Sequence, residues 1–264
     1  MKLYHYTDLV SVLGIIKPER ALEFWGSRYD CMNDPLDYQF AKNRIMGPMI
    51  EASIQQNMKG DTVLPIDVHP FIVSFSKKAD DFLMWRMYHA KVCLVLDSEY
   101  FNRQTPNSAL IECEYMADTQ EAMHSAFSKV DTKIHYCKNI YANVSRISTY
   151  IKHIAFETEG EVRLASWDYY NKTGDKLCLQ DCEEDKNNIV TEGFFSRVNA
   201  NGKIILFKKF AIDGNALSGI IVHTYSEIEF NSIKDALRSV LIQNGFSSDV
   251  FENIQQTSAY PINL

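Results

Sequence analysis

The segment FETEGEVRL, residues 156–164, alternates acidic residues with others along its length. Successive side chains of a β-strand point to opposite faces, so a strand here would separate a charged face from an apolar one. The charged face would carry Glu157, Glu159, Glu161 and Arg163, and the apolar face Val162 and Leu164. A strand over this segment, late in the chain, would therefore crowd two or three carboxylates on one surface beside one guanidinium.

Closely spaced carboxylates on this face have a chemical use. Like charges at i and i+2 repel, which raises the pKa of a carboxyl group, while Arg163 can hold a neighbouring one ionised. A fixed carboxylate stabilises the oxocarbenium-like transition state of glycosidic bond cleavage, and a second group orients the acceptor or the ribose. The alternative interpretation is a solvated strand face with cross-strand ion pairs.

Strands and helices are mixed in irregular order along the rest of the chain. Strand patterns occur at residues 2–6, 70–76, 92–97, 109–115, 161–167, 203–210 and 219–224, and helical patterns at 36–58, 80–88 and 119–153. There is little strict β-α-β alternation. This order predicts an α+β fold with a mostly antiparallel core.

Two further helices are predicted from their capping residues. Thr7 is expected to cap the first, whose apolar face would be Leu9, Val10, Leu13 and Ile16. Ser232 and Asp235 have the spacing of a capping box, which predicts the start of a last helix that Gly245 ends.

Composition limits the class of protein. The chain has 264 residues, of which 46% are hydrophobic, and we expect a single domain over residues 1–264 because no Gly/Ser- or Pro-rich linker divides it. A net charge of −7 disfavours non-specific nucleic-acid binding. Apolar runs fall short of the ~20 residues that span a bilayer, and the cysteines lack zinc-site spacing. We therefore expect a cytoplasmic protein without membrane contact or bound metal.

Three further places carry side chains suited to a ligand. His5 lies near the end of the first expected strand, a position that often faces a crevice, although a lone histidine is also a common structural residue. Ser74 and Ser76 share one strand face and could bond a ribose, or form an ordinary half-exposed face. Trp85 and Tyr88, at i and i+3 of a short helix, either pack in the core or form an aromatic wall for a flat heterocycle.

Five short motifs occur in a recognisable order: LYHYT at 3–7, MNDP at 32–35, SFS at 74–76, MWRMY at 84–88 and EGEVR at 159–163. In this order and spacing, the chain resembles the bacterial family called domain of unknown function 2971 over nearly its whole length. That family is grouped by resemblance with the ADP-ribosyltransferase superfamily. The resemblance implies split antiparallel β-sheets with flanking helices around an NAD cleft. One departure is Lys91, where family members usually have a glycine.

The resemblance also implies roles for individual residues. Glu161 resembles the catalytic carboxylate, and Glu159 its partner that orients the acceptor nucleophile. His5 resembles the residue that bonds the adenosine ribose, and Ser74 and Ser76 the serines that support the glutamates. The other residues expected to bind NAD are Tyr6, Thr7, Phe75, Trp85, Tyr88 and Arg163, while Asn33 and Asp34 match the family's own pattern.

The implied activity is that of an NAD-dependent ADP-ribosyltransferase. Such an enzyme takes NAD as substrate, cleaves its nicotinamide–ribose bond and transfers ADP-ribose to a macromolecular acceptor. The resemblance suggests a bacterial toxin or antiviral defence effector, with an immunity or antitoxin partner. The alternatives are a non-catalytic nucleotide-sensing or protein-binding module, an NAD glycohydrolase, and a hydrolase of another nucleoside-type glycosidic bond.

Overall fold

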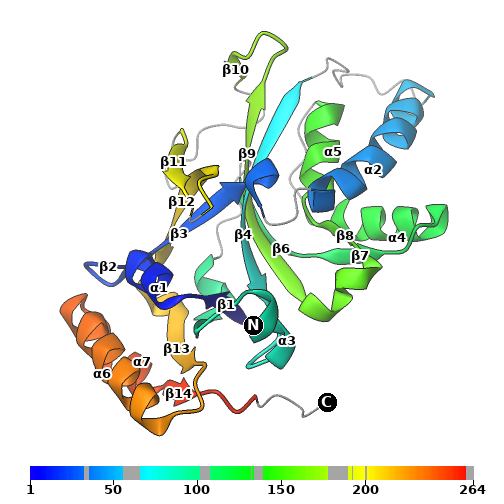
Figure 1. Cartoon of the computed structure of the whole chain (residues 1–264). Helices are drawn as coiled ribbons and strands as arrows, with labels where there is room; N and C mark the ends of the chain where they lie inside the picture. The colour runs from blue at the N-terminus through cyan, green and yellow to red at the C-terminus, as the bar shows by residue number, and fades with distance from the viewer. Residues whose placement is uncertain are drawn as a thin grey trace. The chain divides into compact units, whose positions relative to one another are not determined.

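The computed structural model describes residues 1–32, 36–55, 66–101, 108–131, 133, 139–177, 190–191, 193–199 and 201–259. Helices and strands are mixed, and most of the described strand pairs are antiparallel (Figure 1). Contacts divide the chain into two compact units: unit 1 comprises residues 1–24, 74–102 and 210–264, and unit 2 residues 25–73 and 103–209. The α+β class is confirmed, and the single domain over residues 1–264 stays a prediction.

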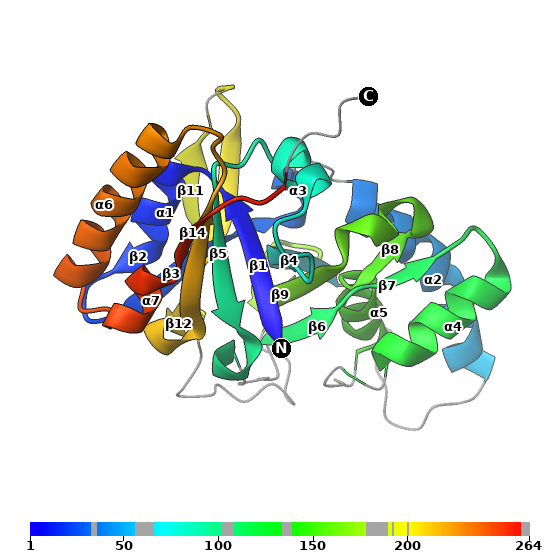
Figure 2. The same ribbon diagram turned by 90° about the horizontal axis from the view of Figure 1, so that it is seen from below.

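Unit 1 is built around β1 (Lys2–Thr7), β5 (Val92–Asp97), β13 (Leu217–Val222) and β14 (Ile254–Gln256), seen side by side in Figure 2. β5 is antiparallel to β1 and β13, and β14 is parallel to β13. Leu3, Leu94 and Ile220 have no exposed surface, so apolar burial holds these strands together. Tyr4 of β1 also pairs with Ser76.

Several of the described helices of unit 1 begin at a side-chain cap. They are α1 (Leu9–Ile15), α3 (Phe82–Met87), α6 (Glu227–Gln243) and α7 (Ser248–Glu252), with the 3-10 helices η2 (Ser98–Phe101) and η4 (Gly214–Ala216) and the short strand β2 (Ile16–Lys17). Asp81 caps α3, because its Oδ1 accepts bonds from the backbone N of Leu83 and Met84 at 2.8 and 3.3 Å.

The predicted start and apolar face of the first helix are wrong. Asp8 caps α1, and its Oδ1 accepts a bond from the backbone N of Ser11 at 2.7 Å. Thr7 still belongs to β1, which shifts the helix by one residue. The buried side chains of α1 are Val12 and Ile15, whereas Val10 is 80% exposed.

The predicted start of the last helix is also wrong, although its end near Gly245 is confirmed. α6 begins at Glu227, where the Oγ of Ser226 accepts a bond from the backbone N of Glu229 at 3.2 Å. Ser226 and Glu229 have capping-box spacing themselves, with the glutamate that the motif favours. Ser232 and Asp235 lie inside the helix.

Unit 2 contains β9 (Glu161–Tyr170), the late strand expected from the sequence, antiparallel to β6 (Ser108–Glu112) and β10 (Lys176–Leu177). β7 (Glu114–Met116) and β8 (Ile151–His153) form a parallel pair. β11 (Phe195–Val198) is antiparallel to β12 (Ile204–Asp213), whose residues 204–209 belong to this unit. Residues 27–28 of β3 (Ala21–Arg28) pair with residues 71–72 of β4 (Asp67–Ser76).

The helices of unit 2 pack around α5. They are α2 (Leu36–Gln55), α4 (Gln120–Asp131) and α5 (Ile140–Ser148), with the 3-10 helices η1 (Tyr29–Cys31) and η3 (Ile154–Glu159). Ala142, Val144 and Ile147 of α5 are fully buried, and α2 contacts both α5 and β8 (Figure 1). The described residues of the predicted helical pattern at 119–153 therefore form two helices and a strand. Among the described residues, no helix has the length and apolar character to cross a membrane.

The predicted charged strand face at residues 156–164 is partly wrong. Glu157 and Glu159 lie in η3, and Gly160 then adopts a left-handed conformation at φ 51° before β9 begins at Glu161. This backbone region favours glycine because it has no Cβ. The turn leaves Glu157 exposed and Glu159 buried, so they do not share the alternation of one strand.

Candidate functional site

Glu161, at the start of β9, lies in a buried group of charges within unit 2. Its carboxylate accepts hydrogen bonds from Lys152 Nζ at 2.7 Å and from Arg163 Nε at 2.9 Å. The three residues are between 1% and 5% exposed. Lys152 comes from β8 and Arg163 from the same strand as Glu161, so the contacts join two strands that do not pair with each other among the described strand pairs.

Two more carboxylates complete the group. Lys152 Nζ also donates to Glu159 Oε2 at 2.6 Å and therefore bridges the two glutamates. Asp37, in the first turn of α2, accepts a hydrogen bond from Arg163, and its Oδ2 lies 3.5 Å from Lys152 Nζ. We call these five residues, Asp37, Lys152, Glu159, Glu161 and Arg163, the charge cluster.

Backbone groups and aromatic side chains hold the charge cluster in place. Arg163 donates to the carbonyl of Thr149 at 2.7 Å, and the hydroxyl of Thr149 accepts a bond from Trp167 Nε1 at 3.1 Å. The backbone N of Glu161 donates to Tyr115 Oη at 2.7 Å. Because these partners come from several elements, the cluster geometry depends on the packing of unit 2 as a whole.

Burial and the neighbouring cations shift the pKa values of Glu159 and Glu161 in opposite directions. Burial would raise the pKa of Glu161, but Arg163 and Lys152 outweigh burial and lower it to about 2. Burial raises the pKa of Glu159, and Lys152 only partly opposes this effect. Glu161 is therefore a carboxylate at neutral pH, while Glu159 takes up a proton more readily than an ordinary glutamate.

This difference predicts an acid-sensitive contribution of Glu161 to stability. A lowered pKa in the folded state stabilises the fold above the unfolded value of 4.5, and this stabilisation is lost as the pH falls through about 2. The stability difference between the native chain and Glu161→Gln should shrink by about 3 kcal/mol over that window. Urea unfolding of both proteins at several pH values measures it, and a pH-independent difference would contradict the assignment.

The residues expected at the N-terminal side of an NAD site lie in unit 1. His5 Nδ1 is 3.0 Å from the carbonyl oxygen of Ser74. Its ring lies edge-on to Phe24 and tilted against Phe75, at centroid distances of 5.1 and 5.5 Å. Burial lowers the pKa of His5, so its imidazole is neutral at pH 7.

The neighbouring expected residues are mostly engaged within unit 1. Tyr6 Oη donates to the carbonyl of Lys78 at 2.7 Å, and Ser76 Oγ accepts from the backbone N of Lys78 at 2.9 Å. The carbonyl of Thr7 accepts from the backbone N of Lys91 at 3.0 Å. Phe75 is buried, and Ser74 is half-buried.

Trp85 and Tyr88 of the expected set differ in exposure. Trp85 is 2% exposed, stacks on His223 at a centroid distance of 4.8 Å and donates from Nε1 to Asp80 Oδ1 at 2.9 Å. Its ring also meets that of Tyr6 edge-on. Tyr88 is 38% exposed. Trp85 thus packs in the core of unit 1, the structural one of the two roles considered for it.

Within unit 2, the structure brings together Glu159, Glu161 and Arg163. Within unit 1, β1, which carries His5, lies beside the strand segment that contains Ser74, Phe75 and Ser76. The convergence of both groups on one NAD pocket stays a prediction. Asn33 and Asp34 lie outside the described residues. Sequence reasoning missed Asp37 and Lys152, although the MNDP motif ends only two residues before Asp37.

Comparison with known proteins gave a single family. Residues 84–164 match the family described as Protein of unknown function (DUF2971). The match runs from α3 into β9 and contains Lys152, Glu159, Glu161 and Arg163 of the charge cluster. It supports the resemblance to that family, whose description names no activity. No curated protein and no solved structure matched the chain.

The matched DUF2971 segment also contains Lys91, the departure noted in the sequence. The backbone N of Lys91 donates to Thr7, and its carbonyl accepts from His223 at 2.9 Å. The left-handed residue in this turn is His89, at φ 48°, and Lys91 is not among the residues with positive φ. The chain therefore does not require glycine at position 91.

Proposed function

We propose that the protein is an NAD-dependent ADP-ribosyltransferase that cleaves the nicotinamide–ribose bond and transfers ADP-ribose to a macromolecular acceptor, with Glu161 as its catalytic carboxylate. The observation that carries this proposal is the charge cluster, in which Glu159 and Glu161 share the ammonium of Lys152. The family match covers the segment that contains both glutamates. The role of NAD as substrate rests on the resemblance stated above.

The two glutamates suit two different steps of this reaction. Nicotinamide leaves as a neutral heterocycle, so the main requirement is a negative charge that stabilises the positive charge developing on the ribose. Glu161 stays ionised and can meet it. The raised pKa of Glu159 suits a group that accepts a proton from the attacking nucleophile. Environments that separate the pKa values of two carboxyl groups often mark such a division of roles.

Lys152 imposes a condition on this mechanism. Its ammonium lies between the two carboxylates and, with Arg163, neutralises Glu161. A ribose that develops positive charge must contact Glu161 in place of Lys152, so substrate binding has to move the lysine. Part of the binding energy is used for this displacement.

The test is nicotinamide release from NAD by Glu161→Gln. Removing the charge should reduce the rate by about 100- to 1,000-fold, as for the loss of one preorganised electrostatic group. The matched control is Glu157→Gln, an exposed glutamate of the same segment, which should retain the native rate. Since Glu161→Gln leaves a partly unpaired cation, thermal unfolding must show that it is folded at the assay temperature.

A second variant covers the case in which Glu161→Gln does not fold. Glu159→Gln retains the contacts of Glu161 with Arg163 and should reduce transfer to the acceptor more than it reduces nicotinamide release. Native protein that releases no nicotinamide, with or without cell lysate as a source of acceptor, would show the proposal to be wrong. Release without labelled macromolecule would instead identify an NAD glycohydrolase.

The full pairing of Glu161 favours a second candidate, a non-catalytic module that binds nucleotides or proteins. Both glutamates are buried and bonded to cations, which is also what a structural cluster requires. Calorimetric titration with NAD separates the two functions. Saturable binding without nicotinamide release identifies the sensor, whereas turnover that depends on Glu161 identifies the transferase.

A further inference from the structure

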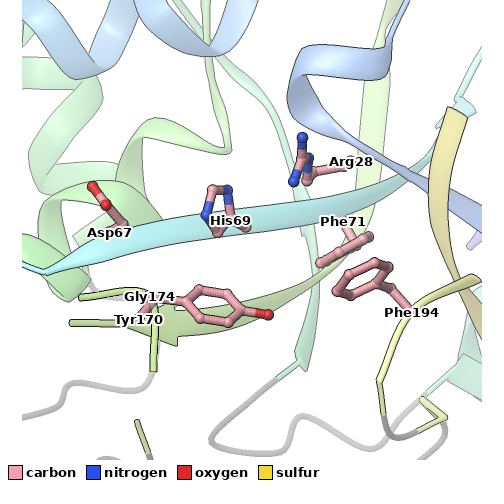
Figure 3. A pocket seen from close by; sticks show the side chains of 7 residues that line it. All are labelled: Arg28, Asp67, His69, Phe71, Tyr170, Gly174 and Phe194. Atoms are coloured by element: carbon pink, nitrogen blue, oxygen red, sulfur yellow. The ribbon is translucent and has the colours of Figure 1, made fainter. Parts of the chain in front are cut away.

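A second feature of unit 2 is a hollow of about 270 Å³ near the far end of β9. Figure 3 shows its side chains: rings from β4 and β9, a ring from the segment before β11, and a guanidinium from β3. Its lining residues are Arg28, Asp67, His69, Phe71, Tyr170, Gly174 and Phe194. We call this site the aromatic hollow.

The aromatic hollow is separate from the charge cluster. Both lie in unit 2, with Glu161 at one end of β9 and Tyr170 at the other. Nine residue steps of a strand correspond to about 30 Å. One NAD molecule with its nicotinamide ribose at Glu161 does not extend that far. A ligand in the hollow is therefore a different molecule, and its binding does not depend on the proposed function.

The walls of the hollow offer flat apolar surfaces. The ring planes of Phe71 and Phe194 are inclined by only 21°, and their centroids lie 6.4 Å apart. The ring centroids of His69 and Tyr170 lie 5.1 Å apart (Figure 3). Phe71 is buried, whereas Phe194 is 50% exposed. An exposed aromatic ring beside a cavity can stack on a planar ligand, and such stacking accepts any heterocyclic ring with a π face.

The polar groups of the hollow leave one negative charge, that of Asp67, and include an unsatisfied atom. Arg28 forms a two-pronged ion pair with Asp30, with both N–O distances 2.6 Å, so its charge is already balanced. Burial and the nearby Arg28 lower the pKa of His69, which keeps its imidazole neutral. Within the described residues, the buried His69 Nδ1 has no hydrogen-bond partner. A buried polar atom without a partner carries a free-energy cost. The His69 ring is only partly buried and lines the hollow, so it can also contact a ligand.

We propose that the aromatic hollow binds a neutral, planar nitrogen heterocycle of nucleobase size, stacked against Phe194 and hydrogen-bonded to His69. The volume of about 270 Å³ is close to the lower end of the ~300–1,000 Å³ typical of ligand pockets, which suits a small bicyclic base of about ten non-hydrogen atoms. The carboxylate of Asp67 at the rim favours the amino group of a base and repels phosphate. The recognised part is therefore the ring and not an anionic group.

Calorimetric titration of the full chain with adenine tests this proposal. Adenine should bind saturably, and Phe194→Ala should weaken the binding by about 10-fold or more, in line with the loss of one stacking contact. His69→Phe keeps an aromatic ring but removes both ring nitrogens, and it should also weaken the binding by about 10-fold. The matched control is Phe195→Ala, which removes the next ring along the chain, outside the lining, and should leave the affinity unchanged.

The other results are equally informative. Absence of adenine binding by the native chain, or equal affinities of the native chain and Phe194→Ala, contradicts the proposal. Binding of inorganic phosphate in place of adenine identifies an anion site and also contradicts it. Nicotinamide release from NAD should be unchanged in Phe194→Ala, which keeps the outcome separate from that of the Glu161 experiment.

Discussion

Arg163→Met should lower the free energy of unfolding by about 3–5 kcal/mol. Methionine fills much of the same volume but leaves Glu161 with Lys152 as its remaining charged partner and deprives Asp37 of its hydrogen bond. Both carboxylates remain buried, and a buried charge that loses its partner keeps its desolvation cost. The loss is therefore much larger than the net value of the ion pair itself.

Urea unfolding followed by circular dichroism measures this loss, and Arg44→Met is the matched control. Arg44 lies on α2 and pairs with Asp118 at 2.6 Å, but both side chains are substantially exposed. Solvent screens such a pair, so the control should lose less than about 1 kcal/mol. Equal losses in the two variants would mean that the charge cluster is accessible to water and not buried as described.

Trp85→Ala should destabilise the protein by about 3–5 kcal/mol, because it removes a large side chain from a packed core. The indole contacts His223 and Tyr6, and its Nε1 bonds Asp80, which also accepts a hydrogen bond from the backbone N of Ser258. The variant therefore disturbs a contact between α3 and the segment that follows β14.

Thermal and urea unfolding measure the effect, with Leu83→Ala as control on the same helix. Leu83 is 51% exposed, so its truncation should change stability by roughly 0.5 kcal/mol or less. If Trp85→Ala instead keeps its stability and loses NAD binding, the aromatic wall considered in the sequence analysis is correct and the core role is wrong.

Much of the secondary structure was predictable from neighbouring residues. β1, β5 and the helix starting after Asp81 agree with the expected segments, since period-two alternation and N-capping are interactions within a few residues. The errors have the same origin. Asp8 caps the first helix in place of Thr7, and Ser226, which accepts from the backbone N of Glu229, caps the last helix in place of Ser232. In each case a better local partner lay close by.

The site was only half predictable. Glu159, Glu161 and Arg163 stand out in one short motif, but their separation by the turn at Gly160 changes which groups they face. The sequence pattern predicts a helix at Lys152, whereas the structure places this residue in strand β8. His69 and Phe194 of the aromatic hollow are more than a hundred residues apart and belong to no recognisable motif.

Amino-acid order alone was enough to establish an α+β chain, its main strands and a pair of glutamates beside an arginine, because alternation, capping and charge spacing act over short stretches. Folding in three dimensions determined that Asp37 and Lys152 join those glutamates in a buried cluster and that one glutamate holds its proton more readily than the other. Those properties depend on burial and on charges brought together from distant positions in the sequence. Neither burial of this kind nor a long-range charge contact produces a periodic sequence pattern.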